Sequence, residues 1–126
     1  MQPPIVALVE DLFFLARIQE TAKSLGLTVT AVDRRSDVTR VAAMKPSALI
    51  IDLNARGLDP IVWIRALKAD RFLQSVPLVA FASHVETQLI AQARAAGCDT
   101  VLARSAFTRQ LPDLLRHLAA PLPQGA

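Results

Sequence analysis

The sequence has few of the residues that stabilise small secreted domains or zinc-binding domains. It contains one cysteine, Cys98, so an intramolecular disulfide is excluded, and no Cys and His pattern has the spacing of a zinc site. The first apolar run, residues 5–9, is far too short to cross a bilayer, and the N-terminus lacks the basic stretch of a signal peptide. We therefore expect a cytoplasmic protein that does not associate with a membrane.

Aromatic residues and blocks of like charge are also scarce. There is no tyrosine and one tryptophan. The 14 Lys and Arg residues, which exceed the 11 Asp and Glu residues and so give a net charge of +3, are spread along the chain. Basic residues without interleaved aromatics offer little on which a nucleic-acid base could stack. Nucleic acid is therefore not an expected partner, and we interpret most basic residues as solvated helix faces.

The sequence does have enough apolar residues for one core. Its 126 residues, 52% of them hydrophobic, match the usual size of a single domain. We place one domain at residues 1–120 and a flexible C-terminal tail at residues 121–126.

Short, continuous apolar runs alternate with segments of helical period. The predicted strands are 5–9, 27–32, 48–51, 77–81 and 100–103, and the predicted helices are 13–25, 36–44, 61–73, 86–96 and 109–118. Continuous apolar runs indicate strands that are buried on both faces, as in a parallel sheet covered by helices. The predicted fold class is therefore α/β, a doubly wound parallel sheet of five strands flanked by five helices.

Several residues fit the expected helix ends. Gly26 and Gly97 each follow a helical segment, where a glycine commonly ends a helix. Ser36 and Thr108 are candidate N-caps, and Pro112 then falls in or near the first turn of the last helix, where a missing N–H costs least.

Polar side chains follow the predicted strands at the edge where ligands of such sheets bind. Glu10 and Asp11 follow the first strand, Asp52 the third, Ser83 the fourth and Arg104 the fifth. Carboxylates gathered at one edge repel each other unless a cation lies among them, and Mg²⁺ prefers oxygen ligands. The sequence therefore predicts an acidic pocket with a magnesium site.

Four segments carry a resemblance to a known family. IVALVED at 5–11, ALIIDLN at 48–54, VPLVAFAS at 76–83 and AAGCDTVLAR at 95–104 resemble the receiver domain of two-component response regulators. The resemblance covers nearly the whole chain and implies a flavodoxin-like architecture. It also implies no enzymatic activity beyond Mg²⁺-dependent self-phosphorylation and dephosphorylation.

The resemblance assigns roles to individual residues. It implies that Asp52 accepts a phosphoryl group from a histidine kinase or a phosphotransfer protein. It implies that Glu10, Asp11 and Asp52 bind Mg²⁺ together with the backbone carbonyl of Asn54.

The sequence departs from the family pattern at several of the functional positions. Ala82 stands where the family has Ser or Thr, so Ser83 is the candidate substitute for the missing hydroxyl. Val101 replaces the aromatic switch residue, and Arg104 and Ser105 replace the usual Lys-Pro pair. Arg104 is expected to serve either as a phosphate ligand or as a permanent ion-pair partner of Asp52.

Three functions fit these observations. The first is a stand-alone receiver that is phosphorylated on Asp52 and docks a partner protein through its last two helices and fifth strand. The second, favoured by Ala82 and Val101, is a degenerate receiver that is not phosphorylated and acts as a constitutive interaction or dimerisation module. The third is an unrelated enzyme on the same fold, for which no glycine-rich phosphate loop is visible.

Overall fold

Five parallel strands form one sheet in the order β2-β1-β3-β4-β5. The computed structural model describes residues 3–83 and 86–119. The strands are β1 (Ile5–Leu8), β2 (Val29–Ala31), β3 (Ala48–Asp52), β4 (Leu78–Ala82) and β5 (Thr100–Ala103). The helices are α1 (Leu12–Ser24), α2 (Val38–Ala43), α3 (Pro60–Ala69), α4 (Thr87–Ala95) and α5 (Arg104–Ala119). This architecture confirms the predicted fold class.

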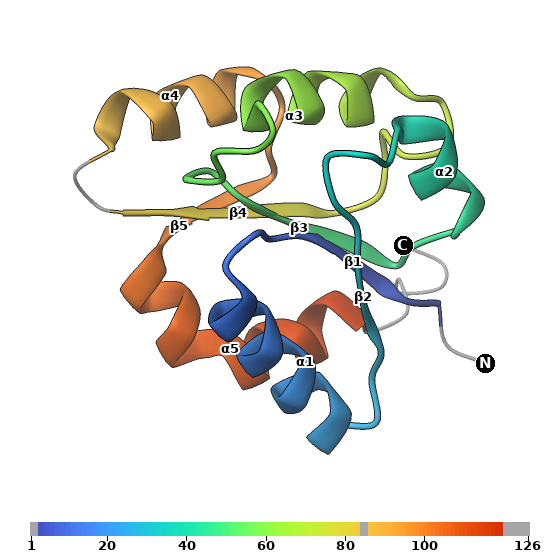
Figure 1. The fold of residues 1–126 in the computed structure, drawn as a ribbon, viewed down its shortest axis with the longest axis vertical. Helices are drawn as coiled ribbons and strands as arrows, with labels where there is room; N and C mark the ends of the chain where they lie inside the picture. Colours follow the sequence, from blue (N-terminus) through green and yellow to red (C-terminus); the bar gives the residue numbers. More distant parts are fainter. Residues whose placement is uncertain (1–2, 84–85, 120–126) are drawn as a thin grey trace, which may run out of the picture.

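Helices cover the sheet on both faces. Helices α1 and α5 lie on one face, and α2, α3 and α4 lie on the other (Figure 1). Every residue of β1, β3 and β4 is buried, and alternate residues enter two different cores. Ile50 and Phe81, for example, pack in the core under α1 and α5, whereas Ile51 and Ala80 pack in the other. Burial on both faces explains why these strands read as continuous apolar runs.

Two predicted helix ends are confirmed and two predicted starts are wrong. Gly26 and Gly97 have φ angles of 74° and 110°, in the region that glycine adopts most easily. The N-cap of α2 is Asp37 and not Ser36, because the Asp37 carboxylate accepts the N–H of Arg40 at 2.8 Å. Thr108 does not cap α5; its hydroxyl donates to the carbonyl of Arg104 at 2.9 Å, one turn inside the helix.

The last helix is longer than the sequence suggests. It begins at Arg104, directly after β5, so Pro112 lies inside it and not in its first turn. Helix α3, by contrast, ends at Ala69 rather than at residue 73. There the Asp70 carboxylate accepts the N–H groups of Phe72 and Leu73, which favours a turn over further helix.

The described part of the chain, residues 3–83 and 86–119, holds no helix with the length and apolar character needed to cross a bilayer. The predicted tail at 121–126 lies outside the described residues.

Candidate functional site

The strand order brings the predicted site residues to one edge of the sheet. β1 pairs with β3 up to Leu8 and Ile51, and β3 pairs with β4 up to Asp52 and Phe81. The segments that follow β1, β3, β4 and β5 therefore all leave the sheet at its carboxyl edge. We call this edge, with Glu10, Asp11, Asp52, Ser83 and Arg104, the rim.

Asp52 is the one charged residue that is buried among those described, with 4% of its surface exposed. It ends β3, and its Oδ1 accepts the N–H of Asn54 at 2.8 Å. Burial raises the pKa of Asp52 above its ordinary value, and the charges of Asp11 and Glu10 act in the same direction. The bond from Asn54 and the charge of Arg104 lower this pKa only in part. The ionised form of Asp52 is therefore disfavoured at this position.

Replacing Asp52 with Asn is expected to stabilise the protein at pH 7. Since the folded-state pKa is raised, the carboxyl favours folding below its ordinary pKa of 3.8, and this advantage disappears as the pH rises through the folded-state value. At pH 7, D52N removes the cost of the buried charge, so we expect a gain of about 1 kcal/mol, or roughly 4 °C in Tm. Thermal melts at several pH values measure this effect. D113N, at an exposed position of α5, is the matched control, and equal gains in both variants would contradict the explanation.

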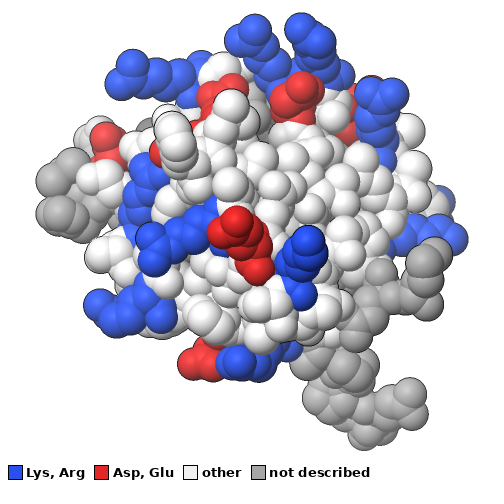
Figure 2. All heavy atoms as spheres, turned by 60° about the horizontal axis from the view of Figure 1, so that its bottom comes forward, with Lys and Arg blue, Asp and Glu red and all other residues white. Residues whose placement is uncertain are grey.

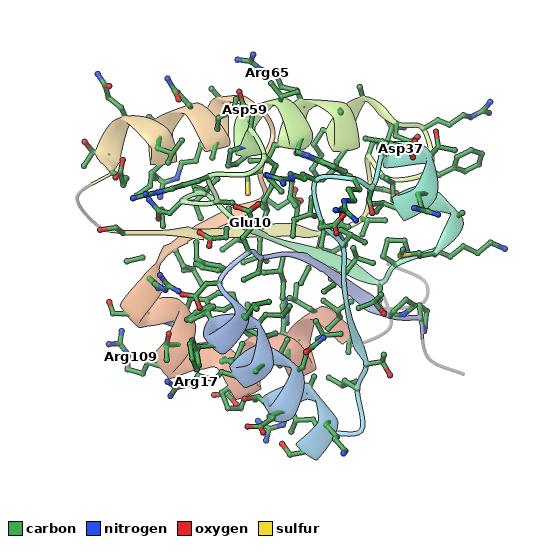
Figure 3. All side chains as sticks on the ribbon, in the orientation of Figure 1. Glu10, Arg17, Asp37, Asp59, Arg65 and Arg109 are labelled. Atoms are coloured by element: carbon green, nitrogen blue, oxygen red, sulfur yellow. The ribbon has the colours of Figure 1, made fainter. Side chains whose placement is uncertain are left out.

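Glu10 is held by the loop after β3. Its Oε1 accepts the backbone N–H groups of Arg56 and Gly57 at 2.8 Å and 2.7 Å. A Cβ at position 57 would collide with Oε2 of Glu10, so any other residue here would require the Glu10 carboxylate to move. Figure 3 labels Glu10 where the chain leaves β1. Sequence reasoning missed these contacts, although Gly57 was a signal of a close approach.

Asp11 has two partners at the rim. Its Oδ1 accepts the N–H of Phe14 at 3.1 Å, which makes it the N-cap of α1. Its Oδ2 accepts from Nη2 of Arg104 at 2.9 Å. The bond from Phe14 and, next, the bond from Arg104 lower the pKa of Asp11. The ionised form of Asp11 is therefore favoured, and its carboxylate is bonded both to the first turn of α1 and to Arg104 of α5.

Aromatic rings support the guanidinium of Arg104. Its Cζ lies 4.3 Å from the ring centroid of Phe14 and 5.9 Å from that of Phe81. The Phe81 ring in turn lies 4.5 Å from the Phe107 ring. Ring faces attract a cation at these distances. One of the two roles expected for Arg104 was an ion pair with Asp52. In the structure Arg104 pairs with Asp11 instead, and its contact with the Phe14 ring supports the same position of the guanidinium.

Asn54 joins the ends of β3 and β4. Its backbone N–H donates to Asp52, and its side-chain Oδ1 accepts the N–H of Ser83 at 3.0 Å. Ala82, at the family's hydroxyl position, is fully buried, and its side chain has no group that could donate to a phosphoryl oxygen. Val101 is half-buried on β5. The loop after β4 is thus tied to β3 through the backbone of Ser83.

The side chains of the three predicted acidic metal ligands already accept hydrogen bonds within the chain. The Glu10 carboxylate is bound to two backbone N–H groups, and the Asp11 carboxylate is bound to Arg104 and Phe14. One carboxylate oxygen of Asp52 accepts the N–H of Asn54, whose backbone carbonyl is the predicted fourth ligand. Within residues 3–83 and 86–119, no three His, Cys, Asp or Glu side chains are grouped so that they could hold a metal ion. The Arg104 guanidinium supplies a cation at the rim.

A parallel sheet of order 2-1-3-4-5 with carboxylates at its carboxyl edge is the fold of response-regulator receiver domains. Many solved receiver structures match nearly the full chain, which confirms at the level of the fold the resemblance predicted from sequence.

Three solved structures illustrate the match. Chemotaxis protein CheY4 of Vibrio cholerae is 13% identical, with 94% of this chain and 99% of that chain covered and a TM-score of 0.79. The receiver domain of sensor histidine kinase PA1611 from Pseudomonas aeruginosa, with magnesium in its active-site cleft, is 20% identical over 94% and 98%, with a TM-score of 0.75. The Mn²⁺-bound form of response regulator Rcp1 is 17% identical over 98% and 100%, with a TM-score of 0.70. The sequence matches no protein-family model and no curated protein.

Proposed function

We propose that the chain is a receiver module of two-component signal transduction that acts by docking to another protein without phosphorylation of Asp52. The observation that carries this proposal is the Arg104 guanidinium, which is paired with Asp11 at 2.9 Å and stacked on Phe14. The arginine fixes the rim in one state, because the cation and its carboxylate partner are already joined.

The surroundings of Asp52 also oppose phosphorylation. A phosphoryl group adds negative charge and three acceptor oxygens at a carboxylate that is already buried. The Ala82 side chain cannot donate to these oxygens, and the backbone N–H of Ser83 is bonded to Asn54. Arg104 would have to leave Asp11 and its aromatic support to turn toward Asp52.

A second candidate function keeps Asp52 as the phosphoacceptor of a histidine kinase or a phosphotransfer protein. Its support is the position of Asp52, a buried carboxylate at the carboxyl end of β3 with the raised pKa that functional carboxylates often have. In this case Ser83 would have to provide the hydroxyl that Ala82 lacks.

The proposed docking surface consists of β5 with α4 and α5. β5 is an edge strand, and its residues are exposed or half-buried, unlike those of β1, β3 and β4. An edge strand offers unpaired backbone N–H and C=O groups to a partner. The proposed partners are a histidine kinase, a phosphotransfer protein or a second copy of this chain.

Phosphorylation is tested by incubating the protein with acetyl phosphate and Mg²⁺ and following its intact mass. We expect no added phosphoryl group, because Ala82 has no side-chain hydroxyl and the Arg104 guanidinium is paired with Asp11. An adduct that appears in the wild type and disappears in D52N would overturn the proposal in favour of the second candidate. D59N is the control, because Asp59 caps α3 through its contacts with Ile61 and Val62 and does not end a strand.

A further inference from the structure

A basic groove lies between α1 and the first half of α5. Its volume is about 920 Å³, within the range of small-ligand sites. Three guanidinium groups and three hydroxyl groups line it: Arg17, Arg104, Arg109, Ser83, Ser105 and Thr108. We call this cavity the arginine groove.

The early start of α5 creates the arginine groove. Since the helix begins at Arg104, residues 104, 105, 108, 109 and 112 recur at helical spacing and lie along one face. Arg17 approaches this face from α1. Figure 3 shows Arg17 and Arg109 beside each other on α1 and α5, and Figure 2 shows basic side chains grouped at the left of this face.

The charges of the arginine groove are unbalanced. None of the described residues that line it carries a carboxylate. Asp11 accepts from only one nitrogen of Arg104, Nη2. A guanidinium has five N–H donors, and the Arg104 side chain is 39% exposed, so other N–H groups can bind a ligand. Arg17 and Arg109 are exposed. Guanidinium groups bind phosphate oxygens in a bidentate manner, and the hydroxyls of Ser83 and Ser105 can supply further donors, whereas the Thr108 hydroxyl already donates to Arg104.

We propose that the arginine groove binds a small ligand that carries phosphate groups, such as a diphosphate. Three guanidinium groups match a ligand with several negative charges better than a single carboxylate. The inference does not depend on the state of Asp52 or on docking of a protein, so it stands or falls separately from the proposed function.

Pyrophosphate is the probe, and binding is measured by calorimetry and by shifts of backbone amide signals. We expect saturable binding that weakens with added salt and shifts the amides of Ser83, Ser105 and Thr108. R17Q and R109Q are each expected to weaken binding by up to about fivefold, and the double variant by roughly tenfold or more. Both side chains are exposed, so circular dichroism should show an unchanged fold.

R65Q is the matched control, because Arg65 is an exposed arginine on α3, on the opposite face of the sheet (Figure 3). It should bind pyrophosphate like the wild type, and acetate at equal ionic strength should not bind. Three results would each overturn the inference: no saturable binding of pyrophosphate, equal weakening by R65Q, or equal binding of acetate.

Discussion

Replacing Phe107 with Ala is expected to lower the free energy of unfolding by about 3–5 kcal/mol, the cost of emptying a phenylalanine site in a packed core. Phe107 is fully buried, and its ring lies 4.5 Å from that of Phe81 and 5.7 Å from that of Phe14. The loss should be large because α1, β4 and α5 meet at these three rings. Urea unfolding followed by circular dichroism measures it.

Phe72 provides the matched control for this prediction. Its side chain is 70% exposed, and it packs in neither core. F72A is therefore expected to change the free energy of unfolding by less than about 0.5 kcal/mol. Equal changes in the free energy of unfolding for F107A and F72A would contradict the prediction that the packing of these three rings stabilises the fold beneath the rim.

Replacing Arg104 with Gln is expected to raise the affinity of the protein for Mg²⁺. The substitution releases the Asp11 carboxylate and leaves Asp11, Asp52 and Glu10 at the rim without the guanidinium. Carboxylates that repel each other favour a divalent cation with oxygen ligands. We expect Mg²⁺ to bind R104Q at least roughly tenfold more tightly than the wild type, a difference of about 1.4 kcal/mol.

Calorimetry measures this affinity, and Trp63 fluorescence offers a second readout on α3. R116Q is the control, because it removes an arginine from the exposed Asp113 pair far along α5. It should leave Mg²⁺ binding as in the wild type. Tight binding to the wild-type protein would show that Arg104 does not hold Asp11 away from a metal.

The strands and their order along the chain could be predicted because burial on both faces leaves a direct trace in the sequence. Residues 48–51 and 77–81 are apolar without interruption, and both fall within or beside strands of the structure. The start of α5 could not be predicted in this way. No turn residue separates it from β5, and Thr108 has the chemistry of an N-cap although its hydroxyl bonds inside the helix.

The sequence predicts which residues lie at the rim but not which of them are in contact. Topology alone brings Asp11, Asp52 and Arg104 to one edge, as expected from the ends of the strands. The partner of Arg104 depends on Phe14, whose ring lies 4.3 Å from the guanidinium, and on where two helices from opposite ends of the chain meet. Such a choice between two nearby carboxylates is made by packing, which has no local pattern in the sequence.

The pair of Asp11 and Arg104 also joins two helix ends. Asp11 is the N-cap of α1, and Arg104 is the first residue of α5, so their 2.9 Å contact fastens the beginnings of both helices on one face of the sheet. Because no loop separates β5 from α5, the same contact also lies directly after the end of β5. The contact therefore links α1 directly to the junction of β5 and α5.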